Sequence, residues 1–208
     1  MVPAAIAAAV LAEVVAWRLV ATGRAGVWRL MIAVFALHGA LAVAMGGFEG
    51  PGDRGSGIAL GLGATTGIAL YSATRGFVAV ASLWPAFRRA VEDRYGRARE
   101  VSLATGLVLA VGVAVPGEEL FWRGLVQDRL TDVTTPALGA VLAWAGYVAT
   151  NLSSTSLPMA AGAIVGGASW AALALFTGGI LASLVCHAIW TGLMLAFPPG
   201  AGRGMMPA

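Results

Sequence analysis

Long apolar stretches, each about as long as a helix must be to cross a lipid bilayer, dominate this sequence of 208 residues. A hydrocarbon core of roughly 30 Å is spanned by about 20 residues of α-helix. Only 11% of the residues are charged, whereas soluble domains carry roughly 25%, and so few charges could not cover the surface of a soluble protein. We therefore expect an all-α, multi-pass transmembrane helical bundle in the cell membrane, with the lipid bilayer as its solvent.

The basic residues are thirteen arginines, with no lysine, against ten acidic residues. They stand mainly between the apolar stretches, where basic side chains anchor helices at the cytoplasmic face. No segment combines dense basic residues with interleaved aromatic side chains, so we expect no nucleic-acid partner. The single cysteine, Cys186, cannot form an internal disulfide.

The apolar stretches predict six to seven membrane helices. The first is expected to be a span rather than a cleaved signal peptide, because Glu13 lies inside it and no charged segment precedes it. In the third, Arg75 and Gly76 predict a span that ends near Ala73 and a half-buried continuation to Pro85. The expected spans cover residues 3–21, 27–48, 57–73, 101–130, 136–152, 157–176 and 179–197.

On this pattern the chain has three parts. Residues 1–100 hold N-terminal membrane helices and a charged linker, residues 101–197 form a second group of helices, and residues 198–208 are a short tail. Residues 88–100, the most charged segment, predict a surface linker or an interfacial helix. The loops near Arg24 and in the linker are basic, whereas the loop that begins at Glu49 is acidic on balance, so we expect the N-terminus outside the cell.

The densest set of charges in an apolar stretch is Glu118, Glu119 and Arg123. Ionisable groups at membrane depth cost at least about 2.5 kcal/mol and are therefore candidates for function. On a helix Glu119 and Arg123 face each other four residues apart, while Glu118 is rotated by about 100° and is left free. A free carboxylate in an apolar pocket is a candidate general base. The alternative is an ordinary helix start, with a proline and two acids at the positive end of the dipole.

Two further polar pairs lie on later apolar stretches, each with four-residue spacing. They are His187 with Thr191, and Tyr147 with Asn151. Either could be structural, His187 as a hydrogen-bonded packing residue and Asn151 as a helix C-terminal cap. Glu13, Arg18 and His38 in the first two spans have no assigned partner and are expected to form interhelical hydrogen bonds or to reach the interface.

The string from Glu118 to Arg123 resembles the EExxxR motif of the CPBP family, the CAAX-protease and bacteriocin-processing intramembrane proteases. Two more family motifs, FxxxH and HxxxN, each lie on a later helix. In this sequence Tyr147 to Asn151 stands where FxxxH is expected, and His187 to Thr191 stands where HxxxN is expected. The resemblance covers residues 101–197, which it makes the protease core.

The resemblance implies an all-helical membrane core with a buried polar site that cleaves a peptide bond near the bilayer surface. Glu118 would activate water with help from the second motif, while the third motif would polarise the scissile carbonyl and hold the oxyanion. Arg123 would lock Glu119 in place. The implied function is therefore that of an intramembrane endopeptidase that acts on a peptide or protein substrate.

This sequence departs from the family pattern at two positions. Asn151 replaces a histidine and cannot take up a proton, and Thr191 replaces an asparagine. These changes leave open weakened hydrolysis, a catalytically inactive immunity or scaffold protein, and, less directly, a transporter subunit. The cofactor also stays open, with a divalent metal such as zinc as the candidate. A three-ligand zinc site would need both glutamates and His187 and would sacrifice the Arg123 pair, so we expect no tightly held metal.

Overall fold

The structure of the protein, a computed structural model, describes residues 2–47, 50, 52–98 and 100–199. The expected end of the second span at Phe48, Glu49 in the acidic loop, Arg99 in the linker and residues 200–208 of the expected tail lie outside the described residues.

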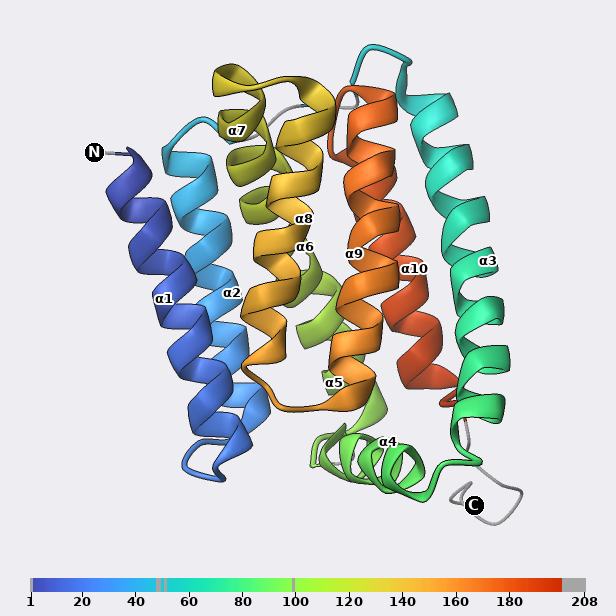
Figure 1. Ribbon diagram of the computed structural model, residues 1–208. Helices are drawn as coiled ribbons and strands as arrows, with labels where there is room; N and C mark the ends of the chain where they lie inside the picture. The colour runs from blue at the N-terminus through green and yellow to red at the C-terminus, as the bar shows by residue number, and fades with distance from the viewer. Residues whose placement is uncertain (1, 48–49, 51, 99, 200–208) are drawn as a thin grey trace.

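The regular structure in the described ranges is helical throughout, without a strand (Figure 1). Four helices come first: α1 (Val2–Ala21), α2 (Val27–Ala44), α3 (Ser56–Ala81) and α4 (Pro85–Ala98). A continuous run follows, made of α5 (Leu103–Leu109), a π-helical segment (Ala110–Ala114), α6 (Val115–Glu119), a second π-helical segment (Leu120–Gln127) and α7 (Asp128–Val133). The chain then forms α8 (Pro136–Leu152), α9 (Leu157–Thr177) and α10 (Leu181–Ala196).

The expected multi-pass helical bundle is confirmed. Five stretches of the described chain are long and apolar enough to cross a membrane alone, namely α1, α2, α3, the run Leu103–Val133 and α9. The 17-residue α8 and the 16-residue α10 are shorter and stand in the same bundle (Figure 1). Local signals mark several ends: Ser102 and Thr135 cap the starts of α5 and α8, and Gly178, in the left-handed conformation, ends α9.

The expected break in the third span is wrong, because α3 continues without interruption to Ala81. The Arg75 guanidinium turns back along the helix and donates a hydrogen bond to the Tyr71 hydroxyl, 3.3 Å away. Gly76 opens onto empty space, so nothing in its surroundings bends the helix. A single arginine near a helix end can reach the interface without breaking the span.

Helix α3 packs closely against α10 through two glycines one helical turn apart. A Cβ at Gly63 would lie 2.6 Å from the Ala182 carbonyl oxygen, and one at Gly67 would lie 2.8 Å from the Cys186 carbonyl oxygen. This is the small-residue spacing that lets membrane helices approach each other. The contact holds α10, which carries His187, firmly against α3.

The placement of the charged segment of residues 88–100 at the membrane interface stays a prediction, while most of this segment is helical and belongs to α4. Helix α4 lies across one end of the bundle in Figure 1 and packs Phe87 and Val91 against Val78 of α3. The loop between α1 and α2, with Arg24, lies at the same end (Figure 1). The two basic segments are therefore together, as the charge pattern requires, while the side of the membrane that this end faces stays a prediction.

Candidate functional site

The site begins with a disturbed helix. Pro116 lies within the run from Leu103 to Val133 and has no N–H to donate to the preceding turn, which interrupts the helical ladder there. The turns on both sides are π-helical, a geometry that occurs often at functional sites in helices. Glu118 and Glu119 stand at the junction of α6 and the second π-helical segment, inside a continuous helical run, so the alternative of an ordinary helix start is wrong.

Two glycines that flank the acids allow the N-terminal part of the chain to approach this helix. A Cβ at Gly117 would overlap the carbonyl oxygen of Phe35 in α2. A Cβ at Gly124 would overlap the carbonyl oxygen of Gly47, just after α2. The motif helix is thus fixed against α2 by backbone contacts that no larger residue would permit.

Glu119 is fully buried between a cation and a histidine. Its Oε1 atom lies 3.3 Å from Arg123 Nη1 and accepts a hydrogen bond from His187 Nδ1 at 2.8 Å. Arg123 also donates to the carbonyl oxygen of Gly167 in α9, 3.3 Å away. The expected Glu119–Arg123 pair is confirmed, and the structure adds His187 as a second partner of the same carboxylate.

Aromatic rings hold this charge cluster in place. The His187 ring is stacked on the Trp170 indole, with centroids 3.5 Å apart and planes 13° from parallel. The Arg123 guanidinium lies 4.7 Å from the centroid of Tyr147 and 5.4 Å from that of Trp170, which places a cation over two aromatic faces. The histidine and the arginine therefore each have one preferred orientation.

Glu118 points to the other side of the histidine. Its Oε2 atom lies 3.8 Å from His187 Nε2, and its Oε1 atom accepts a hydrogen bond of 3.4 Å from the Tyr147 hydroxyl. Glu118 is therefore not the wholly free carboxylate that the sequence predicted, since Tyr147 and His187 both contact it. It remains separate from the Glu119–Arg123 pair and is the glutamate that lines a cavity.

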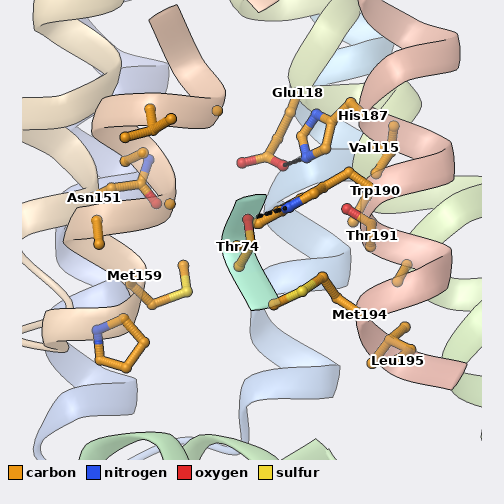
Figure 2. A pocket seen from close by; sticks show the side chains of 18 of the residues that line it. Thr74, Val115, Glu118, Asn151, Met159, His187, Trp190, Thr191, Met194 and Leu195 are labelled. Carbon is orange, nitrogen blue, oxygen red and sulfur yellow. Dashed lines mark hydrogen bonds and ion pairs between the residues drawn. The ribbon is translucent and has the colours of Figure 1, made fainter. Parts of the chain in front are cut away.

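This cavity has a volume of about 370 Å³, and Glu118 and His187 form its polar end, while Tyr95 of α4 adds a hydroxyl group elsewhere on the lining. Its walls are mainly apolar side chains from α2, α3, α4, α9 and α10, so the cavity extends from the site to α4. Figure 2 shows Glu118 and His187 together on one wall, with Met159, Met194 and Leu195 further along. A ligand that fits this cavity would therefore place its polar group at the Glu118 end and an apolar chain toward α4.

The two residues that depart from the family pattern also line the cavity. Asn151 lies on the wall opposite Glu118 and His187 (Figure 2). Its Nδ2 atom donates to the Tyr147 carbonyl at 3.0 Å, whereas its Oδ1 atom has no hydrogen-bond partner among the described residues. The alternative that Asn151 is a helix C-terminal cap is wrong, because Ser153 is the C-cap of α8. Thr191 follows His187 by one turn and is half-buried.

The arrangement of the acids and histidines does not suit a metal ion. In the described part of the chain no three His, Cys, Asp or Glu side chains are grouped so that they could hold one. Glu118 and Glu119 contact opposite nitrogens of His187, whereas zinc ligands surround the ion in a tetrahedron. Arg123 also occupies the carboxylate that a metal would need. These side chains do not fit a three-ligand zinc site.

Sequence reasoning missed two aromatic contributions. Tyr147 entered only as the first residue of a motif, and its hydroxyl group proves to bind Glu118. Trp170 received no role, although it forms the stacking surface for His187. The four-residue spacing of Tyr147 and Asn151 was a usable signal for the first contact. No feature of the sequence singled out Trp170 among seven tryptophans.

A comparison with known protein families identifies part of the chain. The model of the type II CAAX prenyl endopeptidase Rce1-like family matches residues 100–193. The matched part, just under half of the chain, contains all six candidate site residues, and the match confirms the family that the EExxxR pattern indicated. No curated protein and no solved structure matches the chain.

Proposed function

From the Rce1-like domain at residues 100–193, which belongs to a family of proteases, we propose that this membrane protein is an intramembrane endopeptidase of the cell membrane. The observation that carries the proposal is the meeting of Glu118 and His187, both buried and 3.8 Å apart, on the wall of the cavity. A carboxylate and an imidazole at this distance are suited to general acid–base chemistry on a peptide bond.

In the proposed reaction Glu118 is the general base. It takes a proton from a water molecule, whose oxygen attacks the scissile carbonyl carbon. In this proposal His187 is an imidazolium with a proton on each ring nitrogen: Nε2 donates a hydrogen bond to the resulting oxyanion, and Nδ1 donates to Glu119 throughout. Glu118 then passes its proton to the leaving amine as the C–N bond breaks. Formation of the C–O bond is thus accompanied by proton transfer from water to Glu118, and cleavage of the C–N bond by proton transfer from Glu118 to the amine.

The remaining side chains hold these two groups in position. Arg123 neutralises Glu119 and so keeps it as the fixed acceptor for His187. Tyr147 holds one oxygen of Glu118, which orients the other toward His187. Thr191 supplies a hydroxyl group on the same wall as His187, and we assign it a second contact to the oxyanion.

Asn151 is assigned to binding rather than to proton transfer. Its Oδ1 atom is an acceptor without a described partner on the cavity wall, and a peptide N–H group or the attacking water could satisfy it. An amide cannot take up a proton, so Glu118 carries both proton transfers alone. This favours slow hydrolysis over none, because the base and the oxyanion donor are both present.

The shape of the cavity supports a substrate with an apolar tail. The lining changes from Glu118 and His187 at one end to Met194 and Leu195 toward α4. A prenylated peptide, the substrate class in the name of the matched family, would place its lipid chain along the apolar wall and its peptide bond at the polar end. The bilayer would deliver such a substrate already concentrated at the membrane surface.

The experiment uses purified protein in lipid vesicles and a fluorogenic peptide that ends in a prenylated CAAX sequence. The parent protein should cleave it, and Glu118→Gln should lower kcat by at least about 100-fold, the usual worth of a general base. The matched control is Glu92→Gln, the same change at an exposed carboxylate on α4. Equal rates for the parent and Glu118→Gln would reject the assignment.

A second candidate is a catalytically inactive scaffold or immunity protein, which the amide at Asn151 favours. In that case the parent protein would show no cleavage of the prenylated peptide but would still bind it. Binding would then be unaffected by Glu118→Gln, because no proton transfer is required. A vesicle-binding assay with the uncleaved peptide separates the two functions.

A further inference from the structure

A second buried polar cluster lies in the N-terminal helices, outside the matched domain. Glu13 of α1 is fully buried, and its Oε2 atom accepts a hydrogen bond of 3.3 Å from the indole N–H of Trp122. The same oxygen lies 3.7 Å from His38 Nδ1 of α2. His38 is also held by the carbonyl oxygen of Ala9, 3.1 Å away. The expected interhelical hydrogen bonds of Glu13 and His38 are therefore confirmed.

Trp122 connects this cluster to the candidate site. It stands next to Arg123 in the EExxxR string, and its ring meets that of Tyr147 edge to face, with centroids 5.7 Å apart. Gly146 leaves the space for this contact, since a Cβ there would lie 3.2 Å from the Trp122 ring. Tyr147 in turn donates to Glu118. The contacts thus run from α1 to the proposed base without a gap.

A buried carboxylate is an expensive way to pack two membrane helices, because an apolar side chain of similar volume would serve as well. Glu13 offers what an apolar residue cannot, an acceptor that fixes the rotation of one particular indole. The indole has a single N–H group, which donates a hydrogen bond in one direction only. The position of the acceptor therefore determines which edge of the Trp122 ring faces Tyr147.

We infer that Glu13 is a positioning residue: it fixes the Trp122 ring, which holds the Tyr147 hydroxyl on Glu118. The two N-terminal helices therefore complete the site rather than only enlarging the bundle. The effect on hydrolysis rests on the proposed function, whereas the effect on Tyr147 does not. Glu13 does not line the cavity, so it acts through Trp122 and not on a substrate.

The first test does not depend on hydrolysis. Protein in lipid nanodiscs, labelled with ¹⁵N in tryptophan and ¹³C in tyrosine, gives separate NMR signals for the Trp122 indole and the Tyr147 ring, which Trp122→Phe and Tyr147→Phe assign. Glu13→Leu should move both signals, whereas Glu13→Gln, which keeps a carbonyl acceptor, should leave Tyr147 near its parent position. An unmoved Tyr147 signal in Glu13→Leu overturns the inference. Should Glu13→Leu fail to fold, Trp122→Phe must move the Tyr147 signal instead.

The second test uses the prenylated CAAX peptide. Glu13→Leu should lower kcat by about five- to tenfold, the worth of one hydrogen bond, with KM unchanged, and Glu13→Gln should restore most of the rate. In a Tyr147→Phe background Glu13→Leu should have no further effect, because residues that act through one another are not additive. Additive losses would show a general structural role and contradict the inference. A parent protein that cleaves nothing rejects the proposed function, and the Tyr147 signal still decides the inference.

Discussion

The protein contains two buried acid–histidine pairs of similar construction. In one, Glu119 and His187 are 2.8 Å apart, and the histidine is stacked on Trp170. In the other, Glu13 and His38 are 3.7 Å apart, and the histidine is stacked on Phe121, with ring centroids separated by 4.1 Å. The first pair joins α6 and α10, which are distant in the sequence, whereas the second joins the consecutive helices α1 and α2. Their components alone do not distinguish a reactive site from a packed one.

What separates the two pairs is space and charge. The His187 ring and the neighbouring Glu118 line a cavity, whereas Glu13 and His38 do not. The cavity pair also includes a cation, Arg123, in direct contact with the acid. Chemistry needs a reactant beside the titrating groups, so we assign reaction to the first pair and positioning to the second.

The largest loss of stability is expected when the buried ion pair between Arg123 and Glu119 is disrupted. Arg123→Met would leave Glu119 buried without its cation, which costs about 3–5 kcal/mol when one partner of a buried pair is removed. The control is Asp132→Asn, which opens the exposed Arg129–Asp132 pair at a cost of no more than ~1 kcal/mol. Unfolding by SDS in mixed micelles measures both. Similar losses for the two variants would show that the buried pair does not stabilise the fold.

A smaller loss of stability is expected at the close contact between α2 and α6, which joins the N-terminal helices to the helices that carry the site. Gly117→Ala would force α2 and α6 apart at the Phe35 carbonyl and should cost about 1–3 kcal/mol, as overpacking usually does. Gly112→Ala is the matched control on the same helical run, where the added methyl group meets open space. Gly112→Ala should be neutral or slightly stabilising. If Gly117→Ala were equally neutral in SDS unfolding, the close contact between α2 and α6 would be wrong.

The smallest expected effect is a change in kcat from a substitution at Asn151, on the cavity wall. Asn151→His would place a second proton acceptor opposite Glu118 and should raise kcat on the prenylated CAAX peptide by about tenfold, below the usual worth of a full general base. The same substitution should leave the SDS unfolding midpoint nearly unchanged, because the one hydrogen bond that the Asn151 side chain makes to a described residue lies within its own helix. A fall in kcat with an unchanged midpoint would mean that the amide itself has a required contact.

Most of the fold could be predicted because lipid imposes simple rules. Apolar stretches of the required length gave the spans, and the four-residue spacing of Glu119 and Arg123 gave their pair. The continuity of α3 past Arg75 could not be predicted, because it depends on a hydroxyl group one turn away that accepts the guanidinium. The pattern of polar and apolar residues in the sequence does not determine the direction in which a long side chain such as that of Arg75 points.

The site was less accessible to sequence reasoning. Glu118, Asn151 and His187 were found because their motifs keep fixed spacing on separate helices, and all three line one cavity. The contact of Trp122 with Glu13 joins positions 109 residues apart, and only tertiary packing brings them together.

Whether Glu118 reacts and Glu13 only positions other side chains is tested most directly by the same substitution in the two acid–histidine regions. Glu118→Gln and Glu13→Gln each replace a buried carboxylate by an amide of equal size, in vesicles with the prenylated CAAX peptide. Glu118→Gln should lower kcat by at least about 100-fold, while Glu13→Gln should stay within about tenfold of the parent. Equal losses at the two positions, or a larger loss at Glu13, would contradict the assignment of the reaction to Glu118 and of positioning to Glu13.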